Sequence, residues 1–190
     1  MKAWHYAAFG LIGFYLYTQR YSLKGYVVRV TKNWTKFDSL FEKYASLNGV
    51  PAIWLKAIAL NESSLGNAPS VARGLVDPKD TQGSVSTDGK SWGLMQVTLS
   101  TAKMLDSSAT PEKLNDAEYS ISLASKYLKQ LMATFSKSEA RYDEWVIKSY
   151  NQGPGNTLKE KIGSANFPKE GYAAEYWARF QRNLNTIKGV

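Results

Sequence analysis

The longest periodic segment of this sequence lies between residues 110 and 135, and it constrains the fold more than any other feature. It begins with Thr-Pro-Glu, a common helix start, and its apolar residues then recur at helical spacing. These residues are Leu114, Ile121, Ala124, Leu128, Leu131 and Phe135. Such spacing indicates an amphipathic helix that buries one face. We predict one long helix over residues 110–135, packed within a mainly helical domain.

Segments with the same periodicity stand on both sides of it. Residues 35–47 are followed by Gly49, a helix stop signal. Pro51 opens a second, mostly apolar helix that ends near Gly66. Two further helices are predicted over 141–151 and 172–187.

Residues 67–90 contain Gly, Ser, Asp, Thr and Pro with little periodicity, so we predict a long loop or a small strand region there. No internal repeat or low-complexity segment occurs. The chain has 190 residues, 44% of them hydrophobic, which is enough for one main domain with a sizeable core. The sequence therefore predicts a compact, mainly α domain over residues 37–190, with a small strand or loop region.

The N-terminus carries a separate apolar segment. Residues Ala3 to Thr18 include no Asp, Glu, Lys or Arg, with Lys2 before them and Arg20 after them. A bilayer span usually needs about 20 apolar residues and at least about 17. Trp and Tyr residues cluster near both ends, as in an aromatic belt. We predict a membrane anchor helix over residues 1–19; a secretory signal peptide and a hydrophobic helix docked on the domain are the alternatives.

Most of the net charge of +8 belongs to this N-terminal arm and not to the domain. Residues 1–37 hold six basic and no acidic residues, whereas the remaining 18 basic and 16 acidic residues leave only +2. The charge therefore gives little support for a basic face that binds nucleic acid, and we expect no nucleic-acid partner. Residues 20–36 are predicted to form a basic tether, which anionic lipids attract and which favours a cytoplasmic position for the domain.

Cysteine is absent, and the only histidine is His5 in the apolar segment. These counts exclude disulfides, thiolate metal sites, cysteine nucleophiles, a Ser-His triad and multi-histidine metal sites. We expect no metal and no cofactor.

Glu62 follows Ile-Ala-Leu-Asn at the end of the apolar helix that Pro51 opens. A glutamate in this position is most often a solvated surface residue. If it is half-buried, the negative end of the helix dipole and the apolar neighbours would both raise its pKa. A carboxyl group that keeps its proton near neutral pH is what a general acid for a glycosidic oxygen requires.

Three other segments bear on the role of Glu62. GLMQ, at residues 93–96, is apolar but interrupted by a glycine and a glutamine. SYNQGPG, at residues 149–155, ends a predicted helix in a Gly-Pro-Gly turn. Tyr172 and Tyr176 stand at the start of the last predicted helix.

Together with Glu62-Ser63, and in this order, these segments make the chain similar to the Slt-type lytic transglycosylases of the lysozyme-like superfamily. The resemblance extends from about Phe37 to Phe180. It implies a lysozyme-like α+β fold, with the strand or loop region beside a cleft, and an enzyme that cleaves peptidoglycan glycan strands.

The resemblance also implies a role for each matching residue. Glu62 matches the catalytic acid at the end of the helix that crosses the cleft. Gly93 is expected to let the backbone approach a sugar closely. The remaining matches are implied to contact substrate: Ser63 beside the acid, Leu94, Met95 and Gln96 in the groove wall, Tyr150 and Asn151 facing the acid, and Tyr172 near the sugar acetamido group.

The chain departs from the family pattern in three places. The spacing from Glu62 to Gly93 is longer than usual, so the segment between them contains an insertion that could cap the cleft or contact a partner. A serine that usually follows the acid and contacts substrate has Ser70 as its nearest candidate. The usual Ala before Tyr-Asn is Ser149, and a usual Val pair is replaced by Ala173 and Tyr176.

The implied reaction needs one carboxyl group. Glu62 protonates the oxygen between N-acetylmuramic acid and N-acetylglucosamine, and the muramoyl C6 hydroxyl then captures C1 to form a 1,6-anhydro end. A goose-type lysozyme-like hydrolase is the alternative, in which Asp88, or less readily Asp77 or Asp80, would hold a water. Such an Asp in a Gly- and Ser-rich loop is otherwise simple turn chemistry. A non-catalytic peptidoglycan-binding protein is the third interpretation.

The predicted anchor conflicts with this substrate, because peptidoglycan lies outside the cytoplasmic membrane while the basic tether favours an inside domain. We therefore expect a membrane-associated protein that acts on the cell wall, with storage in a virion or secretion machine as one hypothesis.

Overall fold

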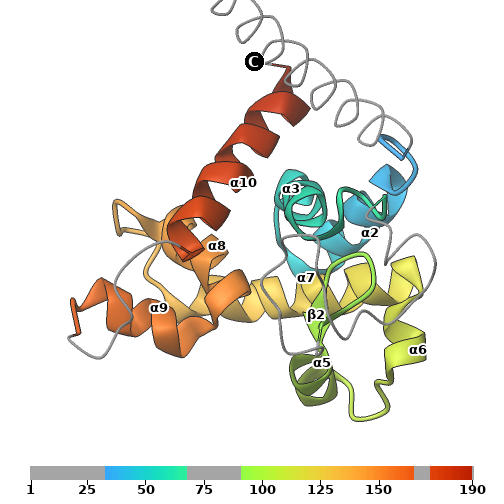
Figure 1. Cartoon of the computed structure of the whole chain (residues 1–190), viewed down its shortest axis with the longest axis horizontal. Coiled ribbons are helices and arrows are strands. Elements are labelled where there is room, and N and C mark those ends of the chain that lie inside the picture. The colour runs from blue at the N-terminus through green and yellow to red at the C-terminus, as the bar shows by residue number, and fades with distance from the viewer. Residues whose placement is uncertain (1–32, 68–90, 165–171, 190) are drawn as a thin grey trace, which may run out of the picture.

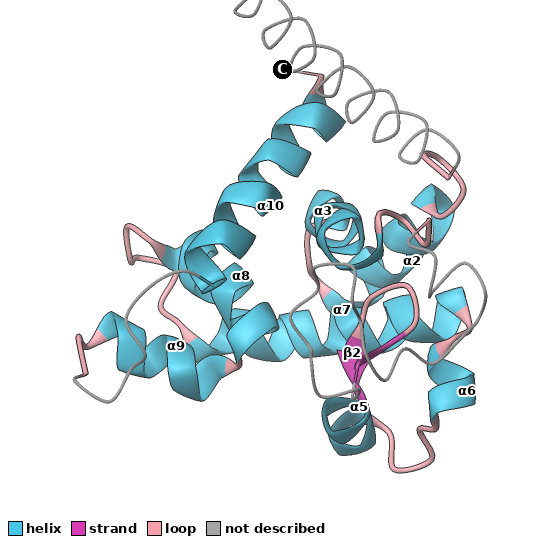
Figure 2. Ribbon diagram, in the orientation of Figure 1, coloured by secondary structure: helices cyan, strands magenta, loops and turns pink. Residues whose placement is uncertain are grey.

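The computed structural model describes residues 33–67, 91–164 and 172–189, and eight helices and one two-stranded sheet lie within them (Figure 2). This confirms the predicted mainly α, lysozyme-like α+β fold class. In chain order the elements are α2 (Asp38–Asn48), α3 (Ala52–Ser63), β1 (Ser91–Trp92), β2 (Val97–Thr98), α5 (Leu99–Leu105), α6 (Pro111–Leu114), α7 (Ala117–Thr134), α8 (Tyr142–Gln152), α9 (Pro154–Lys161) and α10 (Tyr172–Lys188).

The four other predicted helices, two on each side of the long central segment, are present with nearly the predicted bounds. Gly49 ends α2 in the left-handed conformation, at φ 67°, and its amide donates to the carbonyl of Ala45. Pro51 stands just before α3 in an extended conformation. Helix α3 is buried on almost every side, from Trp54 to Leu60, which makes it the central helix of the core.

The long helix predicted over 110–135 is instead two helices, α6 and α7, separated at Asn115 and Asp116. Asp116 caps α7 by accepting a hydrogen bond from the backbone amide of Tyr119 at 2.8 Å. An aspartate favours such a cap over a helix interior because its side chain satisfies one of the unpaired amides of the first turn. Local capping therefore overrode the continuous apolar pattern.

Two helices were not predicted. Thr98 caps α5 by accepting from the amide of Thr101, and Pro154, expected within a turn, is the first residue of α9. Gly153, at φ 81°, lies between the two helices and caps the end of α8 and the start of α9. Pro at the first helical position explains why a sequence that looks like a turn starts a new helix.

Residues 91–98 form a small hairpin. Ser91 pairs with Thr98 and Trp92 with Val97 in antiparallel register, so that residues 93–96 make the turn. A Cβ atom on Gly93 would lie 1.8 Å from the carbonyl oxygen of Leu114, and Gly93 has φ +73°. The close approach that requires glycine here is by the backbone of Leu114 in α6, and the expected approach of a sugar to Gly93 stays a prediction.

The helices converge on the end of α3. In Figure 1, α3 lies near the centre of the body with α2 beside it, α7 runs across the body below them, and α10 rises from α8 past α3. Helix α10 packs on both α3 and α8, while α2 packs on both α3 and α7. The C-terminal ends of α3 and α8 and the first turns of α10 therefore meet in one region.

Several predictions lie outside the described residues. The anchor over residues 1–19, most of the tether over 20–36, and Ser70 and Asp88 in the insertion belong to this set. Within residues 33–67, 91–164 and 172–189, no helix combines the length and the apolar character that a membrane span needs.

Candidate active site

Glu62 is half-buried, in the last turn of α3, and the chain turns sharply after it. Ser64, Leu65 and Gly66 all have positive φ, at 51°, 56° and 74°. For residues other than glycine this conformation costs on the order of 1–3 kcal/mol each, and it persists here because Leu65 is fully buried and its amide donates to the carbonyl of Ala59 at 3.1 Å. This turn over Ser64, Leu65 and Gly66 fixes the end of α3, and with it the position from which the Glu62 side chain projects.

Ser63 joins the end of α3 to the hairpin. Its hydroxyl donates to the carbonyl of Leu94 at 2.7 Å and accepts from the amide of Gly66 at 2.9 Å. The residue is 1% exposed. These contacts point to a structural role for Ser63, and its predicted contact with substrate stays a prediction.

The side chains of the hairpin turn point into the protein. Leu94 and Met95 are buried in the hydrophobic core, and the Met95 amide donates to the hydroxyl of Ser120 at 3.1 Å. Gln96, at φ +46°, donates from its side-chain amide to the carbonyl of Gly93 at 2.8 Å. The hairpin is thus a closed, internally bonded unit, and the predicted role of its three side chains in the groove wall remains to be tested.

Tyr150, in the last turn of α8, locks this hairpin to the helix. Its phenol donates to the carbonyl of Met95 at 2.9 Å, and its ring centroid lies 5.7 Å from that of Tyr127. Burial, followed by the nearby charge of Glu62, raises the pKa of Tyr150 well above its usual value. Tyr150 is therefore a neutral neighbour of Glu62, and the next residue, Asn151, is half-buried at the same helix end.

Tyr176, on α10, contacts Glu62 directly. Its phenol donates to Oε1 of Glu62 at 2.6 Å, and the side chain is 1% exposed. Burial, then the charge of Glu62, then this hydrogen bond raise the pKa of Tyr176 well above its usual value. The phenol thus stays protonated and donates a hydrogen bond to the carboxyl group.

Sequence reasoning placed Tyr172 near the carboxyl group and the sugar acetamido group; it included Tyr176 in the matching segment and as a departure from a usual valine, but gave it no role at the site. Tyr172 begins α10, and the structure does not describe its side chain. The signal that could have identified Tyr176 is its spacing from Tyr172. Residues four apart lie on one face of a helix, so a prediction that places Tyr172 near Glu62 applies to Tyr176 as well.

Asn61 holds α10 against the end of α3. Its side-chain amide donates to the backbone carbonyl of Tyr176 at 3.1 Å, and its oxygen accepts from Asn183 at 2.6 Å. Tyr176 is therefore fixed at both ends, through its carbonyl by Asn61 and through its phenol by Glu62. The described contacts therefore give a half-buried carboxyl group that accepts a hydrogen bond from a phenol, and such a group can exchange a proton with a bound molecule.

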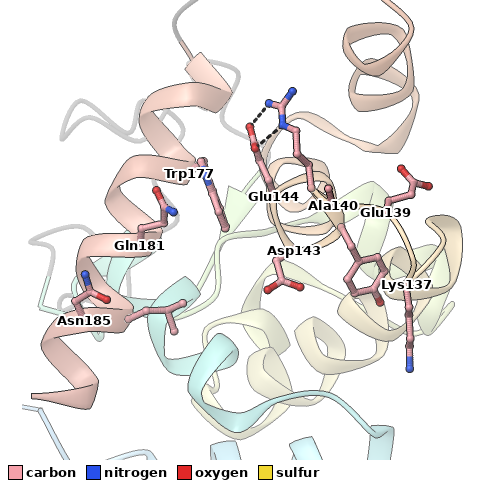
Figure 3. Close-up of a pocket in the computed structure, with 11 residues that line it drawn as sticks. Lys137, Glu139, Ala140, Asp143, Glu144, Trp177, Gln181 and Asn185 are labelled. Carbon is pink, nitrogen blue, oxygen red and sulfur yellow. Dashed lines mark hydrogen bonds and ion pairs between the residues drawn. The ribbon is translucent and has the colours of Figure 1, made fainter. Parts of the chain in front are cut away.

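A separate cavity of about 590 Å³ lies between the start of α8 and the outer face of α10 (Figure 3). Trp177, Gln181 and Asn185 line its α10 side, and Asp143 lies on the opposite wall. Asp143 and Tyr150 are seven residues apart on α8, roughly 10 Å along the helix axis. The cavity is therefore at the other end of α8 from Glu62 and does not belong to its site. Among the described residues, no group of His, Cys, Asp or Glu side chains is placed to hold a metal ion.

Comparison with protein-family models gives one match, to the transglycosylase SLT domain, over residues 39–172. The matched range begins in α2 and ends at the first residue of α10, so it includes the end of α3, the hairpin and α8. No curated protein sequence matches the chain.

Proposed function

This chain belongs to the transglycosylase SLT domain family, whose members cleave peptidoglycan as lytic transglycosylases do, and on that premise we propose that it cuts the β-1,4 bond between N-acetylmuramic acid and N-acetylglucosamine to leave 1,6-anhydromuramoyl ends. Glu62 is the acid and then the base of this reaction. The observation that carries the proposal is the half-buried carboxyl group of Glu62 at the end of α3, with the neutral Tyr176 phenol 2.6 Å from Oε1.

The proposed reaction has two proton transfers and no net consumption of water. Protonated Glu62 gives its proton to the glycosidic oxygen as the bond from that oxygen to muramoyl C1 breaks. The C6 hydroxyl oxygen of the same sugar then bonds to C1, and its proton returns to the Glu62 carboxylate. Because the nucleophile is part of the substrate, its effective concentration is high and no second carboxylate is required.

The other residues around Glu62 have supporting roles in this proposal. Tyr150 and Asn151, at the end of α8, and Tyr172, at the start of α10, stand on the elements that surround the carboxyl group. We assign them to the substrate groove, with Asn151 supplying an amide for sugar hydroxyl or acetamido groups. Ser63, Leu94, Met95 and Gln96 support the groove from the buried side.

Digestion of purified peptidoglycan with the full chain and with Glu62→Gln tests the proposal, with the products identified by mass spectrometry. Muropeptides lighter by one water, formed by the native chain and not by the variant, are the expected result. Reducing ends in their place would identify a hydrolase and direct attention to Asp88. Binding to peptidoglycan without any product would identify a binding protein.

The cellular location is a second, separate proposal. The charge-free segment from Ala3 to Thr18, flanked by Lys2 and Arg20, leads us to propose that residues 1–19 anchor the enzyme to a membrane and that residues 20–36 hold the domain near it. Storage inside a virion or a secretion machine would reconcile a cytoplasmic orientation with a substrate in the cell wall. Protection of the domain from added protease in intact cells or particles is expected, and full accessibility would overturn this orientation.

A further inference from the structure

The cavity between the start of α8 and the outer face of α10 has a lining that the proposed reaction at Glu62 does not use (Figure 3). We propose that this cavity is a second glycan-binding site, which holds an uncharged N-acetylglucosamine unit of a peptidoglycan strand. The choice of this sugar rests on the proposed function, whose substrate is a polymer that contains it. The site itself goes beyond that function, because it binds the polymer away from the carboxyl group that cuts it.

Helix α10 presents one face to the acid and another to the cavity. Tyr176 is buried and donates a hydrogen bond to Glu62. Trp177, Gln181 and Asn185 recur every fourth residue and line the cavity, so they share one face of the helix. Successive residues of an α-helix are rotated by about 100°. A ligand in the cavity therefore contacts a different face of α10 from the one that reaches Glu62.

Trp177 supplies a rigid aromatic surface in the cavity. Its partly buried ring stacks on Phe180, with ring centroids 5.6 Å apart and planes at 19°. Phe180 is fully buried and packs edge-on against Trp54 of α3. The core therefore holds the indole in place, so little side-chain entropy is lost when a ligand packs against the exposed part of the ring. A ring of this kind suits the apolar C–H face of a pyranose.

Polar side chains stand on both walls beside this ring. Gln181 and Asn185 are exposed on the α10 side, and an amide both donates and accepts hydrogen bonds. Asp143 is exposed on the opposite wall, where its carboxylate can accept from hydroxyl groups (Figure 3). An aromatic ring with a few polar groups converging on it is the usual composition of a small-ligand site, and the cavity volume of about 590 Å³ lies in the range of roughly 300–1,000 Å³ typical of such sites.

The charges of the lining favour a sugar over a charged ligand. Three of the charged lining side chains form ion pairs within the protein, namely Glu139, Arg141 and Glu144. The other charged lining residues are one acid, Asp143, and one base, Lys137. A strongly charged ligand would meet no excess of the opposite sign there. N-acetylglucosamine carries no charge, and its hydroxyl and acetamido groups match amide and carboxylate partners.

A second site changes how the protein meets an insoluble wall. Peptidoglycan presents many strands close together, so a second contact becomes intramolecular once the first has formed. Linked contacts of this kind raise the overall affinity without any new contact in the groove at Glu62. We therefore expect the cavity to retain the protein on the wall and to leave the cleavage of a short, soluble fragment unchanged.

The first test is nitrogen-15 NMR of the Trp177 indole N–H in the full chain, assigned with Trp177→Phe. The probe is chitotetraose, an uncharged oligomer of N-acetylglucosamine, and we expect a saturable shift of this signal. The double variant Gln181→Ala/Asn185→Ala should bind about ten-fold more weakly at this signal, because two hydrogen-bonding groups are lost. Gln130→Ala, which removes an exposed amide of α7 outside the cavity, is the matched control and should bind like the native chain.

A synthetic stem tetrapeptide serves as the competing probe. If it shifts the Trp177 signal and chitotetraose does not, the cavity is a peptide site and the inference is wrong. Absence of a shift with either probe, or equal binding of chitotetraose by the double variant and the native chain, would also overturn it.

The second test is co-sedimentation with purified, insoluble peptidoglycan, with Glu62→Gln in every protein so that the wall is not digested. The double variant should show an apparent Kd about ten-fold higher than its parent. With Glu62 restored, it should release products from insoluble peptidoglycan more slowly but cleave a soluble tetrasaccharide fragment with native kcat/KM. Equal retention on the wall, or an equal loss of rate on both substrates, would contradict a separate wall contact. Because the titration and the co-sedimentation need no turnover, they still decide this inference if the native chain releases no anhydro products and the proposed function fails.

Discussion

Two regions of this domain differ in how they surround an ionisable side chain. Lys148, in the middle of α8, has a side chain only 4% exposed and pairs with two carboxylates, Glu144 at 2.9 Å and Glu160 of α9. Glu62, at the end of α3, is half-buried and accepts a hydrogen bond from the neutral phenol of Tyr176. Opposite charges surround the ammonium group of the first region, whereas the described hydrogen bond to the second comes from an uncharged side chain.

The ion pairs of Lys148 with Glu144 and Glu160 attach α9 to α8. The Arg141 guanidinium, and after it Lys148, holds the pKa of Glu144 below its usual range despite burial. Gln152 adds a further hydrogen bond to Glu160 at 2.8 Å. This network joins α9 to α8. It shows that burial alone does not identify a functional carboxyl group, because Glu144 and Glu160 are partly buried in ion pairs that connect two helices.

The largest effect that this comparison predicts is on activity. Glu62→Gln preserves the shape of the side chain and a hydrogen-bond acceptor for Tyr176, but it removes the titratable proton. General acid–base groups contribute typically 10²–10⁴-fold to rate, so we expect release of soluble muropeptides to fall by about that factor. Circular dichroism should show native helicity and a melting temperature within a few degrees of the native chain. A variant with more than a tenth of native activity would contradict the assignment.

The second effect is on stability, at the other member of the comparison. Lys148→Met keeps the volume of the side chain but leaves Glu144 and Glu160 without their shared cation. Loss of one partner of a buried ion pair costs about 3–5 kcal/mol; the partial exposure of Glu160 places the expected loss near the lower limit, about 3 kcal/mol in urea unfolding. Adding Glu160→Gln should recover part of that loss. Equal stability of native and single-variant chains would show that the cluster contributes nothing.

A smaller effect is expected from Ser63→Ala, which removes the hydroxyl that bonds to the carbonyl of Leu94 and the amide of Gly66. Leaving a buried carbonyl unsatisfied costs about 1–3 kcal/mol, so the unfolding free energy should fall by about 2 kcal/mol while KM for peptidoglycan stays near the native value. A raised KM with native stability would instead support the substrate contact predicted from the sequence.

The smallest effect concerns Asp106, which, like Glu62, accepts a hydrogen bond from a phenol, but lies at the surface. Two hydrogen bonds from Ser108 and one from Tyr119 lower the pKa of Asp106 from 3.8 to about 2. A lowered pKa in the folded state stabilises the protein above the unfolded value, and this contribution is lost as pH falls from about 4 to about 2. The melting temperature of Asp106→Asn should thus lie below the native one at pH 6 and converge with it near pH 2. A constant difference over this range would contradict the low pKa.

Sequence periodicity predicted most of the helices, because a repeat of apolar residues reports which face is buried. It could not predict the separation of α6 from α7, since that break depends on a single capping side chain, Asp116, within an otherwise continuous pattern. It also missed α9, where Pro154 begins a helix in a stretch that resembles a turn.

The position of Glu62 at a helix end was predictable, whereas its environment was not. A carboxyl group that bonds to a tyrosine 114 positions away depends on how α3 and α10 cross, and periodicity carries no information about crossing. In the same way, the reason for Gly93 is the carbonyl of Leu114 beside it, a contact between two elements that only the folded chain brings together.

The hydrogen bond between Ser63 and Leu94 has an evolutionary consequence. It joins the two ends of the segment that makes this chain longer than its family pattern, and it does so directly beside the acid. Because the entropy of closing a loop grows only slowly with length, about 0.6 kcal/mol for each doubling, insertions or deletions between these two anchors change stability little and leave Glu62 where it is. Selection can therefore vary the length and sequence of this segment, and with them the range of walls or partners that the protein meets, without altering the end of α3 that carries Glu62.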